Sequence, residues 1–145
     1  MDIVWGVFCQ SAIVDRYTNN ISLVNIIEEL KLEALPPIKE GDEKTPAVAV
    51  DARLVTLWIR SDMEKSERGR GRIRIIYPTG ESSFGPEFDI DLSEFLRLRQ
   101  ISNIPALPIK GEGQYKFILE YEESSSIWIQ KYTLPLRVVF SSSDL

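Results

Sequence analysis

The chain has 145 residues, of which 43% are hydrophobic and 27% charged, and its formal net charge at pH 7 is −5. This length and composition predict one folded domain, residues 1–145, and exclude a disordered or fibrous chain. The acidic balance opposes attraction to nucleic acid and to anionic membranes, and no apolar run approaches the roughly 20 residues of a membrane-spanning helix, so we expect neither partner.

The amino-terminal region is expected to form a β-hairpin. Ile3 to Cys9 is apolar on both of its alternating phases and rich in β-forming residues, which is typical of a central strand. Tyr17 to Asn20 supply turn-forming residues, and Ile21 to Ile27 predict a second strand. The two strands are expected to pair across that turn.

The next segment, Ser22 to Leu35, fits two interpretations. Some of its apolar residues fit the face of a helix, and others fit the face of a strand. We interpret the segment as a strand, with a short helix over residues 28–35 as the alternative because Glu, Leu and Lys favour helices. Residues 36–46 are rich in proline and charge and predict a surface loop within the single domain.

Further strands and a tight turn are expected in the middle of the chain. Val48 to Arg60 is apolar first on one phase and then on both, which indicates a bulge or a strand running from the rim of a sheet into its centre. Ser61 to Gly71 predicts a polar loop. Arg72 to Tyr77 predicts a strand, and the turn signal Pro78-Thr79-Gly80 returns the chain through a strand at Phe84 to Leu92.

The last third of the chain is also expected to be β-structure. Phe95 to Ile104 alternates as a strand that Pro105 ends, with a short helix over residues 93–100 as the alternative. Tyr115 to Tyr121 alternates cleanly, and Ile127 to Phe140 completes a hairpin with it. About eight strands at this spacing predict an all-β fold with at most one short helix: a single-domain antiparallel β-sandwich, immunoglobulin-like or C2-like.

Three features follow one another along the chain. They are a first strand ending in Phe8-Cys9, a second strand Ile21-Ser22-Leu23-Val24-Asn25-Ile26, and a late Gly113-x-Tyr115-x-Phe117-x-Leu119 strand before the closing hairpin. In this order they resemble a family of small bacterial and phage-borne proteins known only as a domain of unknown function. The resemblance spans most of the chain and implies a sandwich fold, with no activity or site residues.

The chain contains no histidine and a single cysteine. Without histidine the commonest general base and metal ligand are missing, which excludes serine triads, papain-like dyads and ordinary zinc sites. Cys9 alone cannot form an intramolecular disulfide, and we expect it to pack as a small buried hydrophobe in a reducing, cytoplasmic environment. We expect no catalytic residues, no cofactor and no metal, and hence a protein that is not an enzyme.

Carboxylates gather around the strand expected at Phe84 to Leu92. Glu87, Asp89 and Asp91, with Glu94 nearby, offer groups that can chelate Ca²⁺ or serve as an acid and base pair. Their spacing is that of any exposed strand face, and no calcium-loop motif accompanies them. We interpret them as a solvated face.

An arginine ladder is the most conspicuous local charge pattern; its members are Arg68, Arg70, Arg72 and Arg74. Such a ladder can bind phosphate or single-stranded nucleic acid. One register of the Pro78-Thr79-Gly80 turn, however, pairs Arg72 with Glu87, Arg70 with Asp89 and Arg68 with Asp91. Because cross-strand ion pairs neutralise such a face, we favour that interpretation, with anion binding as the alternative.

The three tryptophans are expected in the core. Trp5 and Trp58 have apolar neighbours in their strands. A two-residue turn at Ser124-Ser125 pairs Trp128 with Tyr121 in an aromatic stripe that faces the inside of the sandwich. The same register pairs Phe117 with Tyr132 and Tyr115 with Leu134. An exposed tryptophan that stacks on a carbohydrate is the alternative.

The predicted register of that hairpin leaves Ile118, Ile127 and Ile129 together on the opposite face, inside a polar rim. Such a cluster is typical of a modest protein interface, unless another segment of the chain covers it. The sequence therefore predicts a non-enzymatic protein-interaction or assembly module that self-associates into a homo-oligomer or binds a protein partner. The alternative is a ligand-binding module for an anionic polymer or a carbohydrate.

Overall fold

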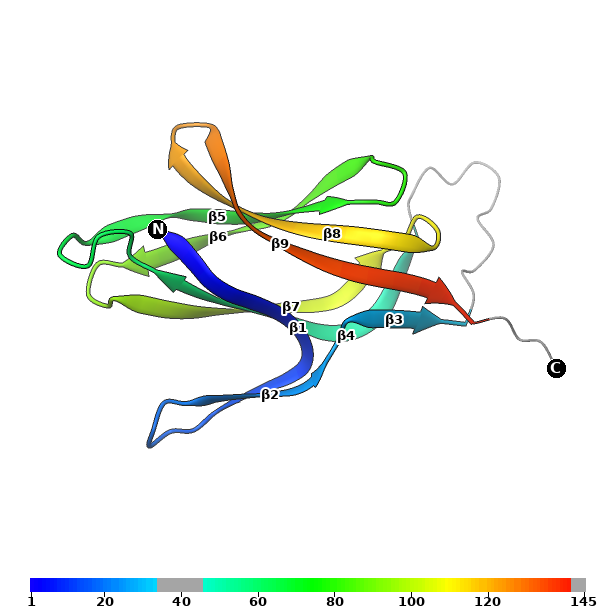
Figure 1. Cartoon of the computed structure of the whole chain (residues 1–145), viewed down its shortest axis with the longest axis horizontal. Coiled ribbons are helices and arrows are strands. Elements are labelled where there is room, and N and C mark those ends of the chain that lie inside the picture. Colours follow the sequence, from blue (N-terminus) through cyan, green and yellow to red (C-terminus); the bar gives the residue numbers. More distant parts are fainter. Residues whose placement is uncertain (34–45, 142–145) are drawn as a thin grey trace.

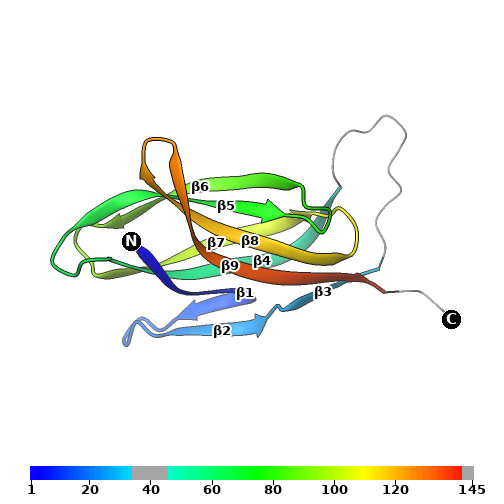
Figure 2. The ribbon, with the colours of Figure 1, turned by 45° about the horizontal axis from the view of Figure 1, so that its top comes forward.

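The fold is a β-sandwich of two packed sheets, as the computed structural model shows (Figures 1 and 2). The structure describes residues 1–33 and 46–141. The strands are β1 (Asp2–Val14), β2 (Ile21–Ile26), β3 (Glu29–Leu32), β4 (Ala47–Ile59), β5 (Glu67–Ile76), β6 (Ser82–Leu92), β7 (Arg97–Pro108), β8 (Gly113–Ser124) and β9 (Ile127–Phe140). The predicted all-β sandwich is confirmed, with nine strands instead of about eight and no helix in the described ranges.

Sheet A has the strand order β2-β1-β4-β7, and sheet B has the order β3-β9-β8-β5-β6. All neighbouring strands are antiparallel except β3 and β9, which run parallel. In its described part, residues 22–33, the contested segment belongs to two strands, because the chain leaves sheet A after β2 and joins the edge of sheet B as β3. The predicted loop at 36–46 lies outside the described residues except for Pro46, whose carbonyl accepts a hydrogen bond from the Ile109 N–H at 3.0 Å.

The core fills the space between the two sheets. Phe8 of sheet A meets Phe117 of sheet B edge to face, with ring centroids 4.6 Å apart. Trp58 is fully buried and packs in a second cluster with Ile90 and Leu92. Because each such side chain contributes roughly 1.5–3 kcal/mol when fully buried, this interior is the main source of stability.

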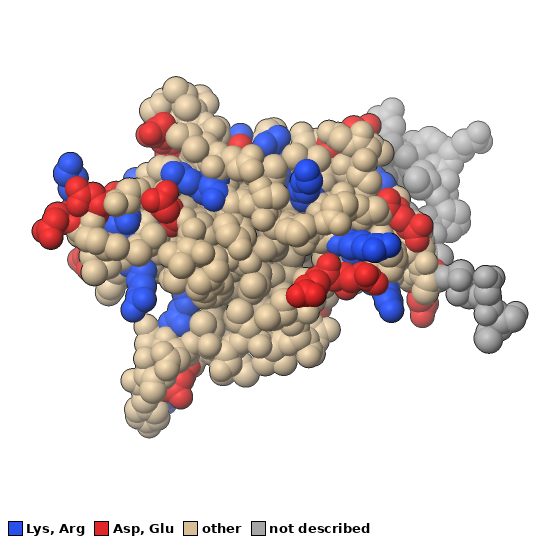
Figure 3. Space-filling view, viewed as in Figure 1, with Lys and Arg blue, Asp and Glu red and all other residues tan. Residues whose placement is uncertain are grey.

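The first strand is longer than predicted and changes its partner at Cys9. Residues 2–9 pair with β4, and residues 9–14 pair with β2. The hairpin of the amino-terminal region is therefore made by the second half of β1, not by Ile3 to Cys9. β1 reverses its direction near this point, so the hairpin folds back beneath sheet A (Figures 1 and 2). We call residues 10–26 the arm; it projects from the body as a mostly uncharged lobe (Figure 3).

Two predicted boundaries are wrong for identifiable reasons. The segment Ser61 to Gly71 is not all loop, because β5 already begins at Glu67. Its glycines suggest a loop, yet Gly69 lies in the strand where the ring of Tyr121 occupies the space a Cβ would need. β7 runs through Pro105, which an edge strand tolerates because no N–H needs a partner on its free side. No helix forms over residues 93–100.

The predicted register of the β8–β9 hairpin is also wrong. Tyr121 pairs with Ile129, and Trp128 pairs with Glu122. The other two predicted pairs are replaced by Phe117 with Leu134 and Tyr115 with Leu136. Ser126 turns the chain with a φ of +64°, and two irregularities interrupt the pairing. Because a slip of one residue exchanges the two faces of a strand, Trp128 lies outside the sandwich instead of in its core.

Candidate functional site

The arginine ladder lies on the outer face of sheet B in the register that the sequence predicts. β5 and β6 pair Arg68 with Asp91, Arg70 with Asp89 and Arg72 with Glu87. Its ion pairs are Arg68–Asp91 at 3.2 Å, Arg70–Glu87 at 3.1 Å, Arg70–Glu122 at 2.6 Å, Arg72–Glu120 at 3.1 Å and Arg74–Glu120 at 3.4 Å. Every guanidinium of the ladder thus meets a carboxylate of a neighbouring strand. This favours a neutralised face, and anion binding by the ladder stays a prediction.

Arg72 is the most enclosed member of the ladder. Its guanidinium carbon lies 4.3 Å from the ring centroid of Phe84 and 4.1 Å from that of Trp128. Its partner Glu120 has a side chain only 8% exposed. The cation–π contacts and the ion pair satisfy Arg72 within the protein, so this cluster has a structural role.

The predicted interface isoleucines do not form one exposed cluster. Ile127 is 57% exposed, whereas Ile118 is 4% exposed. Ile129 pairs with Tyr121, whose ring packs against Trp58 in the core, and so does not share the outer face. Their role as an interface stays a prediction, with Ile127 as the one large exposed side chain among the three.

Of the acidic residues predicted to share the face of β6, Asp91 makes local hydrogen bonds. Asp91 accepts the Oγ–H and N–H of Ser93 and the Nε–H of Arg68, and these contacts, with the Ser93 hydroxyl first, lower the pKa of Asp91. In the described part of the chain, no three His, Cys, Asp or Glu side chains gather where they could hold a metal ion.

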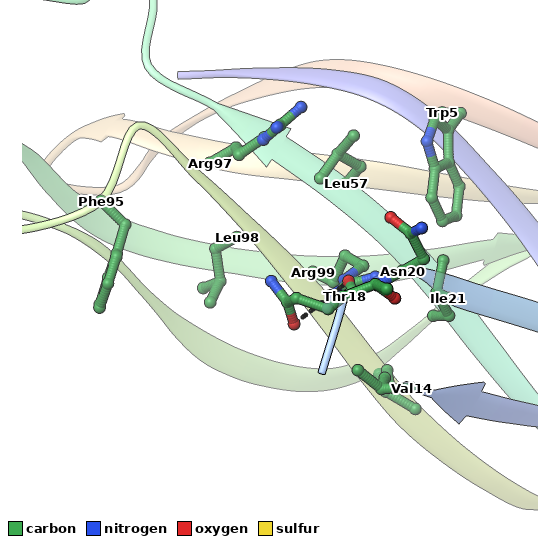
Figure 4. Close-up of a pocket in the computed structure, with 12 residues that line it drawn as sticks. Trp5, Val14, Thr18, Asn20, Ile21, Leu57, Phe95, Arg97, Leu98 and Arg99 are labelled. Atoms are coloured by element: carbon green, nitrogen blue, oxygen red, sulfur yellow. Dashed lines mark hydrogen bonds between the residues drawn. The ribbon is translucent and has the colours of Figure 1, made fainter. Parts of the chain in front are cut away.

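A cleft of about 730 Å³ lies between the arm and the outer face of sheet A (Figure 4). Val14 and Ile21 line it from the arm. Trp5, Leu57 and Ile101 line it from β1, β4 and β7. We call it the arm cleft. Its size and its apolar lining are those of sites that bind ligands or segments of other chains.

The tip of the arm is fastened to β7. Arg99 Nη2 donates to the backbone oxygen of Asn19 at 2.6 Å and to its side-chain oxygen at 2.8 Å. The turn behind Asn19 is held by Asp15, which accepts the N–H groups of Thr18 and Tyr17. These bonds, with Thr18 first, lower the pKa of Asp15. The arm wall of the cleft is therefore preformed.

Arg97 gives the arm cleft an unneutralised positive charge. Among the described residues it forms neither an ion pair nor a side-chain hydrogen bond, and Arg99 contacts only the uncharged Asn19. A second cavity of about 360 Å³, near the link between β2 and β3, holds both Glu28 and Arg137 and has no such excess. The arm cleft thus combines apolar walls with two guanidiniums that form no ion pair with any described carboxylate, in a protein of net negative charge.

The sequence reasoning missed this site. It places Arg97 and Arg99 in a strand and assigns them no role, and it assigns Trp5 to the core although Trp5 lines the cleft. One usable signal was present: the alternation Arg97-x-Arg99-x-Ile101 puts two charges on one strand face. What was not visible is that the arm folds back over that face.

No family model matches the chain, and neither a curated protein nor a solved structure was found to be similar to it. Within residues 1–33 and 46–141, the structure has no helix long and apolar enough to cross a membrane.

Proposed function

We propose that this protein is a non-enzymatic interaction module whose arm cleft binds an acidic, partly apolar segment of a partner protein. Arg97 is the observation that carries the proposal. A guanidinium exposed beside an apolar wall, with no carboxylate partner among the described residues, provides charge complementarity for an acidic partner. The four arginines of the ladder, by contrast, are already ion-paired.

The apolar walls decide which acidic partner fits. A purely anionic polymer offers no apolar group to contact Trp5, Leu57 and Ile101. A neutral sugar offers no negative charge to pair with Arg97. A peptide segment offers both kinds of side chain at once. Self-association through Ile127 is a separate prediction that this proposal does not need.

The proposal is tested with a short fluorescent peptide in which Val and Glu alternate, measured by fluorescence anisotropy. A peptide in which Val and Lys alternate serves as the opposite-charge control, and polyglutamate serves as the control without apolar side chains. We expect the Val/Glu peptide to bind most tightly, with an affinity that falls as salt is added.

Arg97→Glu is expected to weaken this binding by about tenfold or more, because it turns attraction into repulsion. Lys116→Glu makes the same change of charge on the outer face of sheet B and is the matched control. Equal binding by Arg97→Glu and the parent protein, or binding of polyglutamate as tight as that of the Val/Glu peptide, would contradict the proposed function.

A further inference from the structure

The arm cleft extends over the free edge of β7. Arg97 and Arg99 lie on the outer face of this strand, opposite Ile59 and Leu57 of β4. Leu98 points to the other face, where it packs near Trp58, yet it lines the same cleft. Figure 4 shows Phe95 and Leu98 to the left of Arg99 and of the arm residues Ile21 and Val14. An occupant that touches all of them has to lie along the edge of β7, because β7 is the last strand of sheet A.

No strand of the described residues covers that edge of β7. The Leu96 carbonyl accepts the Arg60 N–H of the neighbouring chain segment at 3.0 Å, so the backbone of residue 96 faces the β4 side. Backbone groups alternate sides along an antiparallel strand, so Arg97, Arg99 and Ile101 present their N–H and C=O groups to the free edge.

The residues with free backbone groups are also the ones whose side chains point to the arm cleft. In an antiparallel pair, a residue and the residue directly opposite share one face and interact. A strand added beside β7 would therefore set its own side chains against Arg97, Arg99 and Ile101 in turn. Among the described residues, Arg99 uses only its Nη2, which donates to Asn19, so its other N–H groups can donate to a ligand.

We propose that the partner segment binds as an added antiparallel strand on β7, with an apolar side chain opposite Ile101 and acidic side chains opposite Arg99 and Arg97. Read from its amino end, this segment has the order apolar-x-acidic-x-acidic. The inference rests on the proposed function of the arm cleft and deepens it by naming the conformation and the motif of the ligand. Main-chain hydrogen bonds supply affinity in this mode, and alternate side chains supply specificity.

The test compares a peptide of sequence Val-Thr-Glu-Thr-Glu, flanked by Thr at both ends, with the reversed peptide Glu-Thr-Glu-Thr-Val in the same flanks. Both have the same composition and charge. Antiparallel addition predicts that the first binds about tenfold more tightly or better, because only this order matches Ile101, Arg99 and Arg97.

N-methylation separates strand addition from side-chain docking alone. In the added strand the N–H groups of Val and of both Glu residues point to β7, and those of the intervening Thr residues point away. Methylating the first set is expected to weaken binding by tenfold or more, and methylating the Thr set is expected to change it little.

Three other outcomes have distinct meanings. Tighter binding of the reversed peptide, or equal tolerance of both methylation patterns, would overturn strand addition while leaving the acidic-segment function intact. If the parent protein binds neither of these two peptides and does not bind the alternating Val/Glu peptide, both the strand addition and the proposed function are overturned.

Discussion

Replacing Arg72 with Met tests whether the enclosed ion pair on sheet B stabilises the fold. The substitution removes the guanidinium that lies 3.1 Å from Glu120 and keeps a flexible apolar chain between the rings of Phe84 and Trp128. Glu120, with a side chain 8% exposed, would keep only Arg74 as its cationic partner, at 3.4 Å.

The size of the effect follows from these contacts. Removing one partner of a buried ion pair costs about 3–5 kcal/mol, and a partly desolvated cation–π contact contributes about 1–2 kcal/mol. Arg74 still neutralises Glu120 in part, and Met retains contact with both rings, so we expect a loss of about 2–3 kcal/mol. For a chain of 145 residues this corresponds to a fall of roughly 6–10 °C in the unfolding midpoint.

The midpoint is measured by circular dichroism during heating, with Arg68→Met as the matched control. The Arg68 side chain is 73% exposed in its pair with Asp91, and its loss is expected to change the midpoint little. In a double-mutant cycle, Arg72→Met in a Glu120→Gln background should cost less than it does alone. Equal midpoints for Arg72→Met and Arg68→Met would refute the reasoning.

Two further predictions concern titration and thiol chemistry. Hydrogen bonds, from the hydroxyl of Ser93 to Asp91 and from the N–H of Ser126 to Glu122, lower the pKa values of these carboxyl groups below 3.8 and 4.5. Their contribution to stability is therefore present at pH values above the ordinary carboxyl pKa and is lost as the pH falls through the lowered pKa values. The unfolding midpoint should be constant from about pH 7 to pH 6 and should fall below about pH 5. A midpoint that rises on acidification would contradict this. Cys9 is fully buried, and burial raises the pKa of its thiol, so it should react with Ellman's reagent in urea and not in the native protein; rapid native labelling would show that the arm opens at its bend.

The register of β5 and β6 was predictable because local signals agree. Pro78-Thr79-Gly80 marks the turn, and the arginines of one strand alternate in step with the carboxylates of the other. The β8–β9 hairpin lacks that agreement. Its serine-rich turn admits more than one register. The irregularities near the turn and between Leu119 and Glu120 each shift the pairing by one residue, in opposite directions. Trp128 therefore lies on the opposite face of the sheet from the one predicted.

The arm was beyond sequence reasoning for a different reason. Alternation of apolar residues reports that a segment is extended, but it does not report which strand pairs with it. β1 pairs with β4 before Cys9 and with β2 after it, and nothing in the apolar pattern marks that change. Because the arm cleft exists only where the arm folds back over sheet A, its lining could not be assembled from sequence neighbours.

The arginines of β5 and those of β7 show that the position of a strand in its sheet determines whether its charges are neutralised within the protein. β5 lies between β6 and β8, and both neighbours offer carboxylates to its arginines. Within the described ranges β7 pairs with β4 alone, and the residues of β4 opposite Arg97 and Arg99 are Ile59 and Leu57. The same alternation of arginine is therefore neutralised inside sheet B and left unpaired at the edge of sheet A. An arginine that pairs with no carboxylate of the described residues, beside an edge that no described strand covers, can be met by a strand from another chain.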